Sequence, residues 1–128
     1  MKIPDHLLYT KEHEWILADG ASARIGISDF AQDHLGDVVF VELPAIGARL
    51  NAGAPLASLE SVKAVSEVFM PVSGLVLEVN TSLETAPELL NKDPYASWIA
   101  RVAFDQSLAE AGLMDAAAYR AFCAAGEG

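Results

Sequence analysis

Short apolar runs, separated every several residues by glycine or proline, occupy the middle of this chain. The separating residues are Gly47, Gly53, Pro55, Pro71 and Gly74. Glycine and proline supply turn conformations and end regular elements, and short apolar runs between them are typical of strands. This spacing favours a mainly β domain, a sandwich or a barrel, over a helical or alternating α/β fold.

Two further segments support strands. Residues 15–18 and 21–27 flank Asp19-Gly20, a dipeptide that accepts the positive φ angles of a tight hairpin turn, so they predict a β-hairpin. Residues 37–43 are rich in β-branched and aromatic side chains and end at Pro44. We expect them to form a strand that is buried on much of its surface.

A short helix is predicted between these strands, over residues 29–35. Ser28 can cap its first turn, and Gly36 can supply the left-handed conformation that stops it. Phe30 and Leu35 are expected to face inward.

In the last third of the chain, strand patterns come first, and the hydrophobic pattern changes period only beyond Asp105. Residues 75–80 alternate as a strand, residues 87–94 indicate a turn or one helical turn, and residues 98–104 indicate another strand. The Ala-rich stretches 107–111 and 115–124 predict short helices that pack on the β core.

Lys63 has the most informative surroundings of any charged residue. The strand-like runs 56–61 and 65–70 flank Val62-Lys63-Ala64, which predicts a hairpin with the lysine at its tip. A lysine at a turn is most often a solvated charge, so the pattern alone leaves that interpretation open. An enzyme that acylated this amine would have to deprotonate it, and would need an accessible tip on a stiff hairpin.

The composition limits the classes of partner. The 128 residues predict one domain, 1–128, and 18 acidic against 8 basic residues give a formal charge of -10. This charge repels phosphate backbones and anionic lipids, which disfavours nucleic acid and membrane partners and favours partners with basic surfaces. With one cysteine, Cys123, no intramolecular disulfide is expected.

Several other classes of protein are disfavoured. The N-terminal residues lack the apolar core of a signal peptide and no run is long enough for a membrane helix, so we expect a cytoplasmic protein. His6, His13 and His34 have no metal-ligand spacing, and we expect no metal site. Ser28 lacks the final glycine of a nucleophile elbow, and phosphate-cradling glycine loops are missing. We therefore expect no catalytic site and no enzyme activity.

Six segments together resemble the glycine cleavage system H protein family of lipoyl carriers. They are residues 9–15, 25–31, 35–44, 60–64, 71–74 and 91–95. The resemblance implies a lipoyl/biotinyl-type barrel-sandwich hybrid, with a short helix near the N-terminal third and short C-terminal helices. It also implies that lipoate is attached covalently to Lys63, as an arm that visits several active sites.

The resemblance also implies partners. In this family a pyridoxal-phosphate glycine decarboxylase loads the arm with an aminomethyl group, an aminomethyltransferase passes the carbon to tetrahydrofolate, and dihydrolipoamide dehydrogenase reoxidises the arm. Lipoylating enzymes attach the group itself. Because the loaded arm ends in a cation, carboxylates are expected to line a cleft that shelters it, Glu14 first, with Glu12 and Glu67 as flanking candidates. Glu12 and Glu67 are equally consistent with ordinary surface carboxylates.

Three alternatives remain at the level of sequence. A lipoyl relay, which donates lipoyl groups to 2-oxoacid dehydrogenase subunits, would have the same motifs. A biotinyl domain is disfavoured because Val62 and Ala64 occupy the positions flanking Lys63 where methionines are expected. An interaction domain with an unmodified lysine would differ from both carriers in its intact mass.

Overall fold

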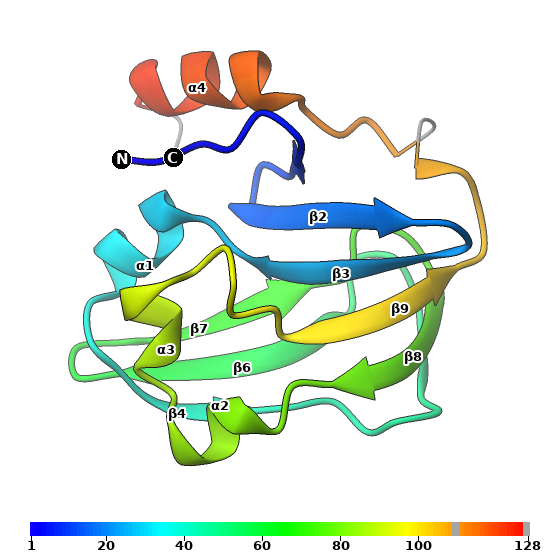
Figure 1. Cartoon of the computed structure of the whole chain (residues 1–128), viewed down its shortest axis with the longest axis horizontal. Helices are drawn as coiled ribbons and strands as arrows, with labels where there is room; N and C mark the ends of the chain where they lie inside the picture. Colours follow the sequence, from blue (N-terminus) through cyan, green and yellow to red (C-terminus); the bar gives the residue numbers. More distant parts are fainter. Residues whose placement is uncertain (109–110, 127–128) are drawn as a thin grey trace.

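The computed structural model describes residues 1–108 and 111–126 and has a mainly β architecture, as predicted. Two antiparallel sheets pack around one main core, and short helices lie at their margins (Figure 1). In the described part of the chain the sheets do not join into a continuous barrel.

The larger sheet has six strands in the order β1-β2-β3-β9-β8-β5. These strands are β1 (Leu8–Tyr9), β2 (Glu14–Asp19), β3 (Ser22–Ile27), β9 (Ala100–Phe104), β8 (Gly74–Val79) and β5 (Arg49–Leu50). The order places β9 against β3, although more than seventy residues separate them in sequence. The two-residue strands β1 and β5 were not anticipated from the sequence.

The smaller sheet has three strands in the order β4-β6-β7. They are β4 (Val38–Glu42), β6 (Pro55–Ser61) and β7 (Val65–Phe69). Strands β6 and β7 form the hairpin predicted around Lys63, and Glu60 pairs with Val65 at its tip end. The turn of this hairpin lies beside α1 (Asp29–Leu35) in Figure 1.

The β2–β3 hairpin is confirmed, but its turn lies one residue later than predicted. Asp19 pairs with Ser22, so the two loop residues are Gly20 and Ala21. Gly20 takes the positive φ angle, 64°. The glycine therefore occupies the first loop position, because the strand alternation fixes the register and the glycine adapts to it.

The prediction that residues 37–43 form a strand buried on much of its surface is wrong in its burial. Val38 and Val41 are buried, whereas Val39 and Phe40 are 54% and 51% exposed. The register with β6 shifts between Val38 and Phe40, which places the two consecutive exposed residues at the irregularity. The strand covers the core with one face only.

Helix α1 begins and ends where the sequence predicts. The Ser28 Oγ accepts a hydrogen bond from the Ala31 N–H at 3.2 Å, and Gly36 follows the helix with φ 79°. Leu35 is buried as expected. Phe30 is half-buried instead of buried, because its ring is stacked between two histidine rings rather than inserted in the core.

Three short helices follow in the second half of the chain. They are α2 (Ser82–Thr85), α3 (Leu89–Lys92) and α4 (Ala116–Ala124). Helix α3 confirms the helical turn expected within 87–94, α4 confirms the helix expected within 115–124, and α2 was not predicted. The helix expected over 107–111 includes residues 109–110, which lie outside the described residues. No helix in the described part is long and apolar enough to cross a membrane.

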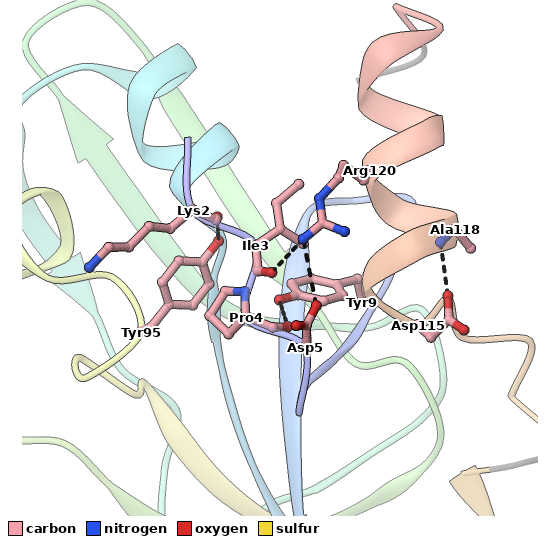
Figure 2. Close-up of polar contacts among 9 residues, drawn as sticks. All are labelled: Lys2, Ile3, Pro4, Asp5, Tyr9, Tyr95, Asp115, Ala118 and Arg120. Carbon is pink, nitrogen blue, oxygen red and sulfur yellow. Dashed lines mark hydrogen bonds and ion pairs between the residues drawn. The ribbon is translucent and has the colours of Figure 1, made fainter.

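Helix α4 holds the N-terminal segment against the larger sheet (Figure 1). Figure 2 shows the polar contacts that fix this segment. The Tyr9 hydroxyl donates to the Pro4 carbonyl at 2.7 Å, and the Arg120 Nη2 donates to the Ile3 carbonyl at 3.1 Å. The Tyr95 hydroxyl donates to the Lys2 carbonyl at 2.6 Å. Side chains from β1, from α4 and from the loop after α3 thereby bind the backbone carbonyls of this segment.

Candidate functional site

Lys63 is exposed in the turn between β6 and β7, at the tip of their hairpin. Its neighbours Val62 and Ala64 are exposed as well. The amine is therefore accessible from solvent. Whether the lysine can be presented to an enzyme in a defined position depends on how firmly the turn is held.

Ser61 fixes the conformation of this turn. Its Oγ accepts hydrogen bonds from the Ala64 N–H at 3.0 Å and from the Lys63 N–H at 3.3 Å. Its backbone N–H donates to the Ala64 carbonyl at 2.8 Å. One serine thus binds three polar backbone atoms of the tip, which limits the motion of the lysine backbone.

The tip is also attached to the segment between α1 and β4. The Val62 N–H donates to the Asp37 carbonyl at 3.0 Å. The Lys63 side chain extends over Gly36, and a β-carbon at this glycine would lie 3.2 Å from the lysine Cε. Gly36 therefore serves twice, as the residue with positive φ that ends α1 and as the surface on which the lysine methylenes lie.

Asn91, from α3, supports that segment from beneath. Its Nδ2 donates to the Gly36 carbonyl at 2.8 Å and to the Gln32 Oε1 at 3.1 Å, while its Oδ1 accepts from the Val38 N–H at 2.8 Å. A single side-chain amide thus joins the end of α1 to the start of β4. This role was missed in the sequence, because it depends on a contact between residues more than fifty positions apart.

Glu14 is buried, with 2% of its surface exposed, and each of its two carboxylate oxygens accepts one hydrogen bond. Its Oε1 accepts from the Thr10 hydroxyl at 2.8 Å, and its Oε2 accepts from the Phe69 N–H at 2.9 Å. The second bond connects β2 of the larger sheet to β7 of the smaller one. Burial raises the pKa of Glu14 to about 7, although these two hydrogen bonds oppose the increase.

The turn before β2 sets the position of Glu14. Thr10 Oγ1 accepts hydrogen bonds from the Glu12 and Glu14 N–H groups, at 3.2 and 3.1 Å. His13 adopts a φ of 68°, which is uncommon for a residue other than glycine. This tight turn directs the Glu14 side chain toward the end of β7 and leaves Glu12 exposed.

A cavity of about 560 Å³ opens beside this carboxylate. Glu12 and Glu14 both line it, so the structure brings together two of the three carboxylates predicted for an arm cleft. Its other lining residues are Thr10, Lys11, Gly53, Phe69, Met70, Pro71, Ala111, Gly112 and Leu113. The cavity thus combines two carboxylates, one cation and several apolar side chains, and can accept an apolar chain that ends in a polar group.

Glu67, the third predicted carboxylate, lies elsewhere. It is exposed and pairs with Ser58 across the smaller sheet. It lines a second cavity, of about 380 Å³, together with Glu42 and residues of the loop after β4. The structure therefore separates Glu67 from Glu12 and Glu14.

A polar network behind the Glu14 turn involves Ser28. The Tyr119 hydroxyl lies 2.7 Å from the Ser28 Oγ and 2.6 Å from the His13 Nδ1. Burial lowers the pKa of His13, which favours a neutral ring whose Nδ1 accepts from the tyrosine. Ser28 is thus a helix cap and a contact of α4, and His13 has a structural role. Among the described residues no group of three His, Cys, Asp or Glu side chains could hold a metal ion.

Comparison with known proteins identifies what the chain is similar to. A family model described as "Glycine cleavage H-protein" matches residues 7–126. A glycine cleavage system H protein from Herpetosiphon aurantiacus is 50% identical over 94% of this chain and 92% of its own length. A probable glycine cleavage system H protein from Thermococcus gammatolerans is 54% identical over 92% of this chain and 90% of its own.

A solved structure gives the same result for the fold. The crystal structure of a glycine cleavage system H protein from Mycobacterium marinum superposes with a TM-score of 0.85 at 37% sequence identity. The match covers 95% of this chain and 99% of that one. The expected fold class, a mainly β barrel-sandwich hybrid with short helices, is confirmed.

Proposed function

Because this chain belongs to the glycine cleavage H-protein family, we propose that Lys63 is its lipoyl attachment site and that residues 1–128 form a single carrier domain. The chain serves as the lipoyl-bearing shuttle protein of the glycine cleavage system. The observation that carries the assignment to Lys63 is its exposed position on a turn whose backbone is hydrogen-bonded by Ser61 and by Asp37.

The surroundings of Lys63 fit a covalently attached arm. When bound, lipoate supplies a dithiolane that accepts and releases a one-carbon unit and two electrons. The residues of this chain present and shelter it. Ser61 holds the backbone of the tip, and Gly36 leaves room for the lysine methylenes to lie against the domain. An attached chain therefore begins at a fixed point.

The cavity beside Glu14 fits the role of a resting place for the end of the arm. At the usual antiparallel rise, β7 spans about 14 Å from Val65, two residues after Lys63, to Phe69, whose backbone N–H binds Glu14. A lysine side chain extended by the lipoyl chain covers a distance of this order. Glu14 would hold a cationic cargo by a charge-assisted hydrogen bond, and the cation would lower the pKa of Glu14 in return.

We assign catalysis to partner proteins. The chain interacts with the other components of the glycine cleavage system, and we propose that these are a pyridoxal-phosphate glycine decarboxylase, an aminomethyltransferase and dihydrolipoamide dehydrogenase. Enzymes that attach lipoate act on the same lysine. In this assignment Lys63 is an attachment point, and the acidic surface of the chain meets basic surfaces on its partners.

Intact mass tests the attachment site directly. The purified chain is incubated with a lipoate–protein ligase, lipoate and MgATP, and its mass is measured before and after. We expect a single increment of about 188 Da, which is the mass of one amide-linked lipoyl group. Peptide mapping should place the increment on Lys63 and on none of Lys2, Lys11 and Lys92.

The matched control is Lys63→Arg, which keeps the positive charge but has no acylable primary amine. This variant should fold normally and gain no mass. An increment that persisted in Lys63→Arg, or that mapped to another lysine, would contradict the assignment.

A further inference from the structure

The three-stranded sheet has one face that is turned away from the core. Buried Val41 pairs with buried Leu59, so these residues mark the core face. Directly paired residues in antiparallel strands share a face, and successive residues alternate. The opposite face, which we call the outer face, carries two cross-strand rows: Phe40, Glu60 and Val65, then Glu42, Ser58 and Glu67.

The row nearer the hairpin tip is largely apolar and exposed. Phe40 is 51% exposed and Val65 is 67% exposed. Val62, which precedes Lys63, is 70% exposed, and Val39 adds a further exposed side chain on β4. Elsewhere in the described part of the chain, the only large exposed hydrophobic residues are Met1 and Ile46. A concentration of this kind around one lysine is typical of a contact surface.

The second row contains two carboxylates, Glu42 and Glu67, and the first row contributes Glu60. Strands β4, β6 and β7 contain Glu42, Glu60 and Glu67 but no lysine or arginine. In the part of the chain that the structure describes, none of these three carboxylates forms an ion pair. The outer face therefore presents uncompensated negative charge directly behind its apolar row.

A hollow lies between the acidic row and the loop that follows β4. It has a volume of about 380 Å³ and is lined by Glu42, Ser58 and Glu67 on the sheet side, and by Pro44, Ala45 and Ala48 among others on the loop side. Carboxylates flanking apolar walls suit a long basic side chain, whose methylenes contact the walls while its charged end is bound by the carboxylates.

We propose that the outer face is the docking surface for the enzyme that acylates Lys63, and that this enzyme places an arginine or lysine side chain in the hollow between Glu42 and Glu67. The inference rests on the proposed function. An active site that receives the Lys63 amine must cover the surface next to the tip, and the apolar row Phe40–Val65 begins there. Covering it removes apolar area from water, and basic residues pair with the acidic row.

A second copy of this chain does not suit the same face. A symmetric contact through this face would place the acidic rows of both copies in one interface, and like charges at short distance oppose association. The charge of the face thus selects a partner with basic groups.

The experiment measures initial rates of lipoylation as a function of carrier concentration, with a purified lipoate–protein ligase, lipoate and MgATP. In Phe40→Ser/Val65→Ser we expect KM to rise about tenfold with kcat nearly unchanged, because the ligase loses apolar contacts made equally in the ground and transition states. Ala117→Ser/Ala121→Ser is the control, since both alanines are exposed on α4, which packs over the larger sheet and away from this face (Figure 1). It should leave KM unchanged.

The hollow is tested separately. Glu42→Gln/Glu67→Gln should raise KM severalfold and make it less sensitive to NaCl, because two of the charges that attract the ligase are removed. The control is Glu84→Gln/Glu88→Gln, which removes two exposed carboxylates, one in α2 and one directly before α3. Circular dichroism and the unfolding midpoint of each variant report whether the fold is kept.

The outcomes separate the two proposals. If wild type gains mass at Lys63 but both test variants keep KM within twofold of their controls, the docking surface is overturned and the attachment site stands. If wild type gains no mass, both are overturned. Light scattering that showed a dimer abolished by Phe40→Ser/Val65→Ser would assign the face to a second copy and overturn the proposal as well.

Discussion

Glu14 has the most constrained environment of any titratable residue near the candidate site. Its carboxylate is almost fully buried, yet it binds the Thr10 hydroxyl and the Phe69 N–H. Burial opposes ionisation, and the hydrogen bonds favour it, with burial the larger effect. Because its pKa is about 7, small changes in its surroundings alter its charge near neutral pH.

We predict that Glu14 makes stability depend on pH. Its pKa is raised from 4.5 in the unfolded chain to about 7 in the folded protein, so between these values the folded state holds a proton that the unfolded state releases. The stabilising effect is therefore present below pH 4.5 and is lost as pH rises through 7. Glu14→Gln cannot titrate and lacks this dependence.

The measurement is urea unfolding of wild type and Glu14→Gln between pH 5 and 8. The difference in the free energy of unfolding, wild type minus variant, should fall by about 1 to 3 kcal/mol across this range. A difference that stayed constant, or that increased with pH, would show that the carboxyl is ionised throughout.

Gly36 should matter for the presentation of Lys63 as well as for stability. Gly36→Ala places a β-carbon 3.2 Å from the lysine Cε and forces alanine into a φ of 79°. We expect a loss of about 1 to 2 kcal/mol from the backbone conformation and a slower lipoylation of Lys63 as its methylenes are displaced.

Gly20→Ala is the matched control for this prediction. Gly20, in the β2–β3 turn, has a φ of 64°, and a β-carbon there would meet no atom within 4 Å. Its stability loss, measured by urea unfolding, should be similar, while the lipoylation rate should equal that of wild type. Equal lipoylation rates in the two variants would remove Gly36 from the presentation of the lysine.

At the scale of elements, the Tyr119 hydroxyl links α4 to the cap of α1 and to the turn before β2. Tyr119 is fully buried, and its hydroxyl contacts both Ser28 and His13. Tyr119→Phe removes the hydroxyl that Ser28 and His13 both contact. We therefore expect a loss of about 1 to 3 kcal/mol in the free energy of unfolding. Tyr9→Phe, which removes a single bond to the Pro4 carbonyl, should cost less in the same urea titration. Equal losses would argue against a shared network.

The elements also show where local sequence was sufficient. Ser28 and Gly36 mark both ends of α1, because capping and positive φ are properties of a few adjacent residues. The β2–β3 turn was displaced by one residue, since its register depends on which side chains the core accepts. The burial of β4 was misjudged because nothing in residues 37–43 indicates that its second face stays uncovered.

For the whole molecule, the formal charge of -10 predicts that salt stabilises the fold. Screening reduces the repulsion among carboxylates, and we expect NaCl between 0.02 and 0.5 M to add roughly 1 kcal/mol, or a few degrees in Tm. Differential scanning calorimetry at pH 7 measures the change. At pH 4.5, near the sequence pI of about 4.5, the same salt should have little effect. If salt stabilised the protein equally at both pH values, the stabilisation would have a cause other than net charge.

The sequence by itself determined the mainly β fold, the ends of α1 and the hairpin that carries Lys63, because strand alternation, helix caps and turn residues act over a few adjacent positions. Only the tertiary structure decided which distant residues meet. It joined Glu14 to Phe69, placed Asn91 beneath Gly36, separated Glu67 from Glu12 and left one face of β4 uncovered. The physical reason is that pairing between strands and packing between sheets depend on the whole set of contacts, which no local pattern encodes.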